Sequence, residues 1–328
     1  MKLIRPSYEI INQEPGMQGI YDIIERCGKI SYKSEAKGGE TARKFVEARL
    51  KEKHGAVLEF GTVYLTVPYG IDEHEIVRFY EANQYSRVNS WDDGQEINYY
   101  ITTNYRVIAE KNRFDDLRYL CEPTEFHARR YTVKFITDIG VGREFLRHRV
   151  MSPLQESTRY VNYMKEKFGE QCTFVIPPWI PREKLGIGDN VSWWDDDWVN
   201  MDNMKIVKLG PAELEPDPVE VWLSTMSAAE TSYRILINFG WTPEQARTVL
   251  PLSTKTEYAL CGYKDAWVHF FRLRSDIAAT GKPHPQAEEI ANPLREHFLE
   301  RQYISREDLQ HEAFGAFDVC ISDTNLKN

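Results

Sequence analysis

The chain has 328 residues, with 41 Lys and Arg against 50 Asp and Glu, so its formal net charge is −9. Hydrophobic residues make up 42% of the sequence, enough to bury a core, which excludes an intrinsically disordered chain. The acidic balance argues against a general nucleic-acid or anionic-membrane binder, because such partners are held mainly by cationic surfaces. Any anion that binds must therefore be held by a local cluster of positive charge.

Cysteine usage and the N-terminus indicate the compartment. The five cysteines are scattered and form no CxxC pair: Cys27, Cys121, Cys172, Cys261 and Cys320. An odd, dispersed set fits reduced thiols better than a disulfide framework. The first residues contain no signal-peptide pattern, and no apolar run approaches the ~18 residues of a membrane span. We therefore expect a cytoplasmic protein with no membrane segment.

The N-terminal part alternates between helical and extended patterns. Apolar spacing predicts helices over 16–31 and 40–53, and Gly55, just past the second helix, is a usual stop signal. Residues 56–70 alternate and are rich in β-branched side chains, which predicts a strand. A short helix is expected over 72–83.

The middle of the chain predicts most of the remaining strands. Residues 97–110 indicate two strands, or one strand and a bend. Residues 129–141 alternate clearly and predict a strand, with a short helix following over 143–149. Residues 172–181 predict a strand ended by prolines. Residues 186–203 predict a surface loop whose tryptophans pack locally, with a ligand lid as the alternative.

The C-terminal part is mostly helical. Helices are predicted at 217–240, 242–251, 264–276 and 285–300. Thr242 and Gln245 form a capping box, Asp265 is expected to cap the third helix, and Pro293 is expected to bend or interrupt the fourth. The order of elements along the chain is helices, then strands, then helices, which favours an α+β arrangement over alternating βαβ units. We expect a single domain spanning 1–328.

Residues 140–145, GVGREF, begin like a dinucleotide fingerprint. Phe145 stands where the third glycine is needed, so a glycine-permitted turn between strand and helix is the favoured interpretation. Positive charge then gathers in LRHRVMSPLQESTRY, residues 146–160. On its own, this charge could be a solvated patch at a helix C-terminus, where the dipole favours cations.

The hydroxyl groups that follow favour an anion site instead. Ser157 and Thr158 can donate hydrogen bonds to anionic oxygens, and Arg159 supplies charge, which together indicate a phosphate clamp. A nucleophilic role for Ser157 is disfavoured, because a hydroxyl needs an adjacent base and no triad pattern surrounds it.

Arg274 continues an apolar stripe with Trp267, Phe270 and Phe271. A buried arginine needs a partner, which could be a structural carboxylate or an anionic or strongly polarised ligand. Arg247 lies in a similarly apolar stretch. The histidines show no tight metal-ligand spacing, so no metal is predicted.

The stretch RHRVMSPLQES (147–157) reads Arg-His-Arg, seven residues, then Ser, and so resembles the signature of the flavin-dependent thymidylate synthases. Other stretches of the chain resemble further segments of that family: HGAVLE (54–59), ARTVLPLSTKT (246–256), and WVHFFRLR (267–274) with His284 and Gln286 beyond it. These ordered matches together are specific.

The resemblance implies the family's own α+β (α/β) fold, with a central, mostly antiparallel sheet and helices, and not a Rossmann fold. It implies reductive methylation of dUMP to dTMP, with methylenetetrahydrofolate as carbon donor and NADPH as reductant of FAD. No protein nucleophile attacks the uracil in that chemistry. The family works as a homotetramer with FAD and substrate sites at subunit interfaces.

The resemblance also implies roles for individual residues. Flavin contacts are expected from His54, Arg147, His148, Arg149, Gln155, Tyr263, Lys264, Asp265, His269 and His284. Substrate contacts are expected from Glu144, Arg147, Gln155, Glu156, Ser157, Thr158, Arg159, Arg247 and Arg274. Ser157 and Arg159 would hold the dUMP phosphate, with Arg247 from another subunit. Arg274 would be the catalytic residue that favours ionised uracil.

The sequence also departs from the family pattern. Gln155 replaces a carboxylate that touches both ligands, so either the amide does that work or Glu156 takes it over. Glu144 stands where Gln is common, and Phe60 where His is common. The span of about 61–130 predicts an insertion. Two alternatives stay open: a flavoprotein of this fold that modifies another pyrimidine nucleotide, and a non-catalytic nucleotide-binding protein.

Overall fold

The computed structural model describes residues 1–31, 34–70, 73–92, 97–159, 161–165, 169–185, 217–278 and 281–310. The predicted loop at 186–203 and Cys320 lie outside these residues. A four-stranded sheet forms the centre, in the order β2 (Ser7–Ile11), β6 (Arg130–Asp138), β9 (Lys255–Tyr263) and β7 (Ser152–Gln155). All three neighbouring pairs are antiparallel, which confirms the predicted α+β, mostly antiparallel fold.

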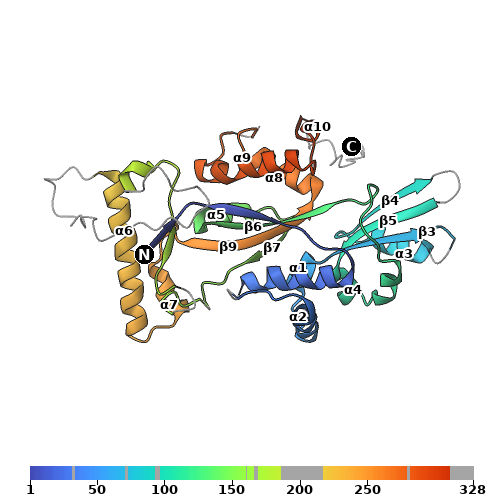
Figure 1. Cartoon of the computed structure of the whole chain (residues 1–328), viewed down its shortest axis with the longest axis horizontal. Coiled ribbons are helices and arrows are strands. Elements are labelled where there is room, and N and C mark those ends of the chain that lie inside the picture. Colours follow the sequence, from blue (N-terminus) through green and yellow to red (C-terminus); the bar gives the residue numbers. More distant parts are fainter. Residues whose placement is uncertain are drawn as a thin grey trace, which may run out of the picture.

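Helices cover both faces of this central sheet, as Figure 1 shows. On one face lie α8 (Lys264–Arg274) and α9 (Pro285–Glu300), and on the other lie α1 (Gly16–Ile30) and α2 (Gly39–Lys51). Side chains alternate along β9 as a strand requires: Tyr258 and Leu260 pack in the cluster of α8 and α9, whereas Ala259 and Cys261 pack against α1.

A second, three-stranded antiparallel sheet occupies most of the predicted insertion. Its order is β3 (Thr62–Pro68), β5 (Ile97–Asn104) and β4 (Arg87–Asp92). The accompanying helices are α3 (Glu73–Glu81), α4 (Tyr105–Glu110) and the 3-10 turns Gly55–Phe60 and Phe114–Tyr119. Val63, Leu65 and Ile101 share an apolar cluster with residues of α1, so this sheet is joined to the central one through that helix.

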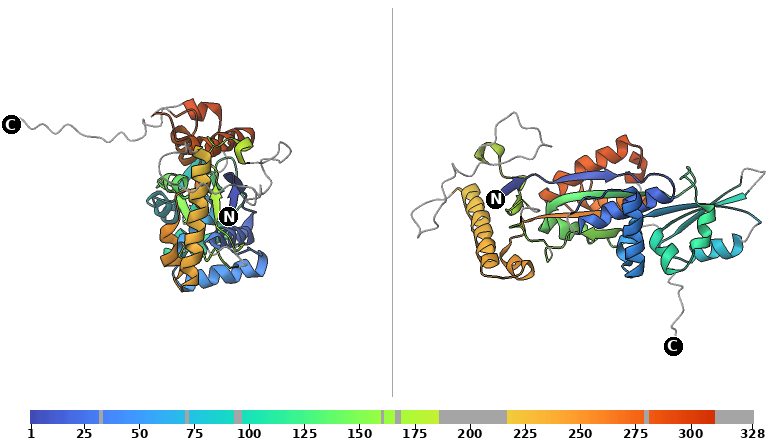
Figure 2. Two further views of the ribbon diagram at one scale, coloured as in Figure 1. Left: turned by 90° about the vertical axis from the view of Figure 1, so that its left-hand side faces the viewer. Right: turned by 60° about the horizontal axis from the view of Figure 1, so that its bottom comes forward.

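The opposite end of the molecule holds α6 (Pro218–Asn238), as Figures 1 and 2 show. The remaining elements are β1 (Lys2–Ile4), β8 (Thr173–Val175), α5 (Ile139–Phe145), α7 (Pro243–Ala246), the 3-10 turns Arg182–Leu185 and Arg247–Val249, and α10 (Arg306–Gln310). Strands β1 and β8 pair in parallel. In α7 the predicted capping box is present, with the Gln245 side chain accepting the Thr242 amide at 2.9 Å.

Several predicted boundaries were wrong, and caps explain the two that matter for the site. Residues 105–110 form α4 rather than a strand, because the Asn104 side chain accepts the Val107 amide at 3.2 Å and starts a helix. Helix α5 begins at Ile139, four residues early, because Asp138 accepts the Val141 amide at 2.9 Å. The segment 147–149 therefore follows the helix instead of lying on it.

Three smaller predictions also differ. Residues 55–60 form a 3-10 turn before β3 rather than the start of a strand. Tyr263, not Asp265, occupies the N-cap position of α8. Pro293 lies inside a continuous α9 and does not interrupt it.

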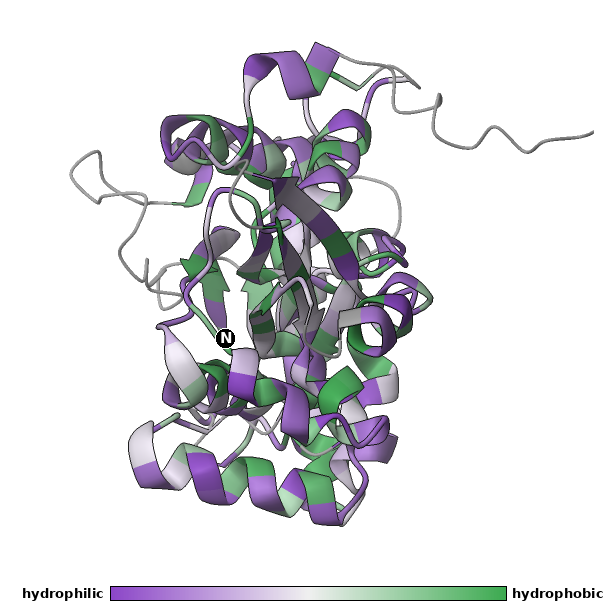
Figure 3. Cartoon of the chain, turned by 90° about the vertical axis from the view of Figure 1, so that its right-hand side faces the viewer, coloured by the Kyte–Doolittle hydropathy of each residue, from purple (hydrophilic) through white to green (hydrophobic). Residues whose placement is uncertain are grey.

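The helices pack through one apolar side each. In Figure 3 hydrophilic and hydrophobic residues alternate along them, as expected for amphipathic helices. Among the described residues, no helix combines the length and the apolar character that crossing a membrane requires. The four cysteines in the described part are free thiols, as expected.

The Asp138 cap predicts a measurable stability effect. Its carboxylate accepts hydrogen bonds from the Val141 amide and from Gln286 Nε2, both at 2.9 Å. We expect Asp138→Ala to lower the free energy of unfolding by about 1–2 kcal/mol, measured by urea denaturation. Asp138→Asn retains a cap oxygen and is the control. A loss in the Asn variant equal to that in the Ala variant would contradict the capping role.

Candidate active site

Arg274, the last residue of α8, is held by α5. Its Nη1 donates to Oε2 of Glu144 at 2.6 Å and its Nη2 donates to the Glu144 carbonyl oxygen at 2.9 Å. Its Nε donates to Nε2 of His148 at 3.4 Å. The partner that a half-buried arginine needs is therefore, in this chain, a carboxylate. Burial lowers the pKa of Arg274, and the charge of Glu144 opposes that change.

His148 is a neutral, buried imidazole. Burial is the largest cause of its lowered pKa, and together with the positive charge of Arg274 and the neighbouring His269 it lowers that pKa to about 3. The rings of His148 and His269 lie 5.9 Å apart. Its neighbours Arg147 and Arg149 are exposed. The chain reversal after α5 thus sends the imidazole inward and both guanidinium groups outward.

Gln155 lies at the same end of α5. Its Nε2 donates to Oγ1 of Thr256 on β9 at 3.0 Å. A Cβ at Gly142 would lie 3.7 Å from that Nε2 and 3.1 Å from Cγ2 of Thr256. Glycine at this position lets α5 approach the strands closely. The predicted glycine-permitted turn was wrong, because the strand passes into the helix at Asp138 and both glycines lie within α5.

Glu156 lies on the other face of the sheet from Gln155. Its Oε2 is 3.2 Å from Nζ of Lys255 and accepts the Glu257 amide at 3.2 Å. Because Lys255 and Glu257 alternate with Thr256 along β9, the two neighbouring side chains point to opposite faces. Within one chain, the two side chains therefore have different surroundings: Gln155 meets Thr256 and Glu156 meets Lys255.

The predicted phosphate clamp is assembled within one chain. Nη1 of Arg247 donates to Oγ1 of Thr158 at 2.8 Å. The short turn after α7 brings Arg247 to Thr158 within one chain, and the contribution expected from Arg247 of another subunit stays a prediction. Arg159 is exposed and Ser157 is partly exposed, so both can face a ligand.

The expected flavin-contacting turn, Tyr263 to Asp265, is engaged by the second sheet. Arg87 of β4 pairs with Asp265 at 2.6 Å and lies over the Tyr263 ring at 4.2 Å. Lys264 pairs with Asp308 at 2.8 Å. Sequence reasoning missed Arg87, because nothing in the spacing of an isolated arginine links it to a turn 178 residues away.

The remaining expected flavin residues are divided between the two faces of the sheet. His54 is exposed and precedes the turn at Gly55–Phe60, which packs beside α1. His284 caps α9 on the other face, accepting the Gln286 amide at 3.3 Å, and its ring lies 5.9 Å from that of Trp179. One chain therefore does not bring all ten together.

Comparison with known proteins identifies the family. A family model described as "Thymidylate synthase complementing protein" matches residues 122–300, more than half of the chain. The chain belongs to the flavin-dependent thymidylate synthase family. The matched region contains the Arg-His-Arg segment, Gln155, Arg247 and Arg274, whereas the segment around His54 lies outside it.

Curated relatives carry the same name. The chain is 25% identical over 166 residues to a flavin-dependent thymidylate synthase of Thermosipho africanus, and equally to that of Thermosipho melanesiensis. Each match covers 51% of this chain and 63% of the relative. A third relative, from Haloarcula marismortui, is 27% identical over 155 residues, covering 46% of this chain and 58% of the relative.

Among solved structures, the chain resembles the UMP/dUMP methylase PolB from Streptomyces cacaoi bound with 5-Br dUMP. The TM-score is 0.40 at 18% identity, covering 92% of this chain and 93% of PolB. A score this low supports no argument about function. Within the described residues, no group of three or more side chains suited to a metal ion occurs.

The family membership implies FAD, and the donors at the end of α5 suit it. Arg147 and Arg149 present exposed guanidinium groups, which bind phosphate oxygens bidentately. His148 between them is neutral and accepts a hydrogen bond. This combination fits a diphosphate with an uncharged ring beside it.

A buried acid on α9 predicts a pH effect on stability. Glu289 has a buried Oε2 with no hydrogen-bond partner among the described residues, and Oε1 lies 3.8 Å from Arg5. Burial raises the pKa of Glu289 to about 7; Arg5 opposes this and Asp138 adds to it. Because the folded-state value exceeds the ordinary 4.5, folding favours the neutral form, and this stabilisation is lost as pH rises through 7.

We therefore expect Glu289→Gln, which mimics the neutral acid, to gain stability relative to the native chain between about pH 5 and about pH 8. The pKa change limits the gain to about 3 kcal/mol. Denaturant unfolding of both proteins at the two pH values measures it. Parallel pH dependence of the two proteins would show that Glu289 does not titrate in this range.

Proposed function

We propose that this protein is a flavin-dependent thymidylate synthase that converts dUMP to dTMP, with methylenetetrahydrofolate as carbon donor and NADPH as reductant. The observation that carries the proposal is the corner between α5 and α8. There Arg274 contacts both Glu144 and the neutral His148, and His148 is the middle residue of the family's Arg-His-Arg segment. The runner-up is a flavoprotein of the same fold that acts on another pyrimidine nucleotide, and Gln155 is the residue that favours it.

Arg274 is proposed to stabilise the uracil as negative charge develops on it. A guanidinium in a partly buried, pre-arranged position acts on such charge more strongly than one in water. Glu144 neutralises Arg274 when no nucleotide is present and must yield part of that interaction to the base. Ser157, Arg159 and Arg247 are proposed to hold the phosphate, and Gln155 to orient the base beside Thr256.

FAD is proposed to bind with its phosphates at Arg147 and Arg149. When bound and reduced, it supplies the hydride that completes the methyl group. His148 remains uncharged through neutral pH, so it orients Arg274 without competing with it for a negative ligand. Tyr263, Lys264, Asp265 and His269 are proposed to line the same site from the start and middle of α8.

A homotetramer with shared sites is part of the proposal. The expected flavin residues lie on both faces of the central sheet, with His54 beside α1 and His269 on α8. A single flavin cannot reach through a packed sheet, so a site with both residues needs two copies of the chain.

The deciding experiment is the formation of dTMP from dUMP, methylenetetrahydrofolate and NADPH, with and without added FAD. We expect product that depends on the flavin. Parallel reactions with dCMP and with hydroxymethylated acceptors test the runner-up. Product from one of those acceptors and none from dUMP would replace the proposed substrate, and the amide at Gln155 would be its first explanation.

Arg274 should be needed for turnover and not for flavin retention. We expect Arg274→Ala to lower kcat for dTMP by at least about 100-fold, because it removes the charge aimed at the base. Flavin content, measured by absorbance of the purified protein, should be unchanged. The matched control is Arg272→Ala: that guanidinium, on the same helix, donates to the carbonyls of Asp308 and Leu309. Normal turnover in Arg274→Ala would exclude the activating role.

A further inference from the structure

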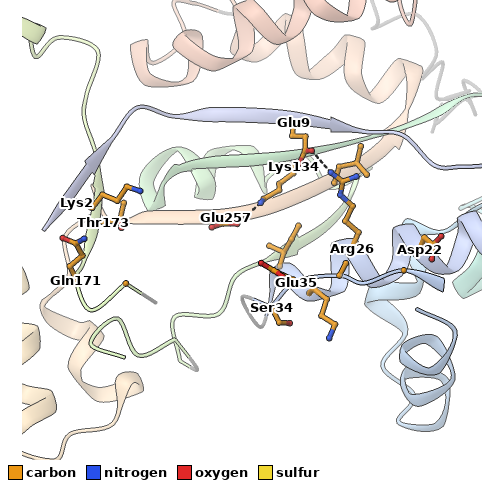
Figure 4. A pocket seen from close by; sticks show the side chains of 16 residues that line it. Lys2, Glu9, Asp22, Arg26, Ser34, Glu35, Lys134, Gln171, Thr173 and Glu257 are labelled. Atoms are coloured by element: carbon orange, nitrogen blue, oxygen red, sulfur yellow. Dashed lines mark hydrogen bonds and ion pairs between the residues drawn. The ribbon is translucent and has the colours of Figure 1, made fainter. Parts of the chain in front are cut away.

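Below the central sheet lies a cleft of about 980 Å³, between α1 and the β1–β8 pair. Figure 4 shows Lys134 and Glu257 on the sheet above it and Arg26 on α1 beside it. Among the described residues that line it, four side chains are cationic (Lys2, Arg26, Lys29, Lys134) and four are anionic (Glu9, Asp22, Glu35, Glu257).

A row of alternating charges runs from this cleft into the protein. Lys134 lies 3.0 Å from Glu257, Glu257 also contacts Lys255, and Lys255 lies 3.2 Å from Glu156. Side-chain exposure falls steadily along the row, from 27% for Lys134 to 19%, 8% and finally 0% for Glu156. We call these four residues the charge row. Its buried end is the residue immediately before the phosphate clamp.

The inner pair, Lys255 and Glu156, is the most strongly constrained part of the charge row. Glu156 is tied at two points: its carboxylate meets Lys255 and the Glu257 amide, and its own amide donates to the Glu257 carbonyl at 2.8 Å. Burial alone would raise the pKa of Glu257, but Lys255 and Lys134 outweigh it and lower the pKa to about 2. Glu257 is therefore charged at neutral pH and can pair with both lysines.

We propose that Lys255 is a positioning residue for nucleotide binding, because it anchors Glu156 and thereby fixes the backbone of Ser157, Thr158 and Arg159. This inference rests on the proposed phosphate clamp. Arg247 holds Thr158 from the far side of the same segment at 2.8 Å. The clamp is thus held at the residue before it and at its middle residue, Thr158, so a ligand meets donors whose backbone is already ordered. Such preorganisation lowers the cost of binding without a new contact to the ligand.

The competing interpretation is that the charge row only stabilises the sheet. Lys134 distinguishes the two interpretations, because it pairs with the same carboxylate, Glu257, whereas the ion pair of Glu156 is made by Lys255. Removing Lys134 weakens the row at its exposed end and leaves the anchor in place. If the row were purely structural, removing either lysine would loosen the clamp. If Lys255 is the anchor, only its removal does so.

The first test is hydrogen exchange of the full chain without any substrate. In Lys255→Met we expect the amides of Ser157–Arg159 to exchange at least about tenfold faster, because their anchor is lost and this segment opens locally. Lys134→Met should leave them within about twofold, as expected for a more exposed pair. Lys255→Arg keeps the cation and should restore most of the protection. Unchanged exchange in Lys255→Met would overturn the proposal, whether or not dUMP is the substrate.

The second test is dUMP affinity by calorimetry. We expect Kd to rise about tenfold in Lys255→Met and to change less than about twofold in Lys134→Met. Equal losses in both variants would favour the structural interpretation and overturn the anchor. No dUMP binding by the native chain would instead count against the proposed function, while hydrogen exchange still tests the anchor.

Lys255→Met leaves the buried carboxylate of Glu156 without this partner, which can prevent folding. In that case Lys255→Met/Glu156→Gln removes both charges and replaces the single variant in both tests. Thermal unfolding checks that it is folded. Native-like protection of Ser157–Arg159 in this variant would also overturn the proposal.

Discussion

The constraint on which the site depends is that charge buried on either side of the central sheet must be paired. On one face Arg274 is held by Glu144 and His148, and on the other Glu156 is held by Lys255. Stranding either charge would be costly, so both pairs fix local geometry as well as charge. They are joined through β7 and β9, because Gln155 and Glu156 are consecutive residues that point to opposite faces.

This arrangement explains how an acidic chain can hold several anions. Positive charge at the end of α5 is exposed where a ligand can reach it, as at Arg147 and Arg149, and neutralised where it is buried, as at Arg274. Under the proposed function, an anionic nucleotide would exchange one negative partner of Arg274 for another. The change in net charge of the corner would be small, and so would the accompanying cost of desolvation.

The sequence predicted the fold class and most helices, because apolar periodicity and turn residues are local signals. It failed at both ends of α5: Asp138 caps the helix and starts it early, and the helix ends at Phe145, before Arg147–Arg149. The Arg274 stripe correctly predicted a buried arginine with a partner. Its spacing could not say that the partner is Glu144, since that contact joins residues 130 apart.

Roles assigned to single residues from a family motif depend on strand pairing, which the motif does not contain. The motif alone leaves Gln155 and Glu156 equally placed to replace the usual carboxylate, because they are neighbours in sequence. Strand register places them on opposite faces: Gln155 pairs with Tyr258 and its side chain meets Thr256, whereas the next residue turns to Lys255. Two neighbours that the motif treats alike therefore have different surroundings within one chain, and only the pairing of β7 with β9 reveals this.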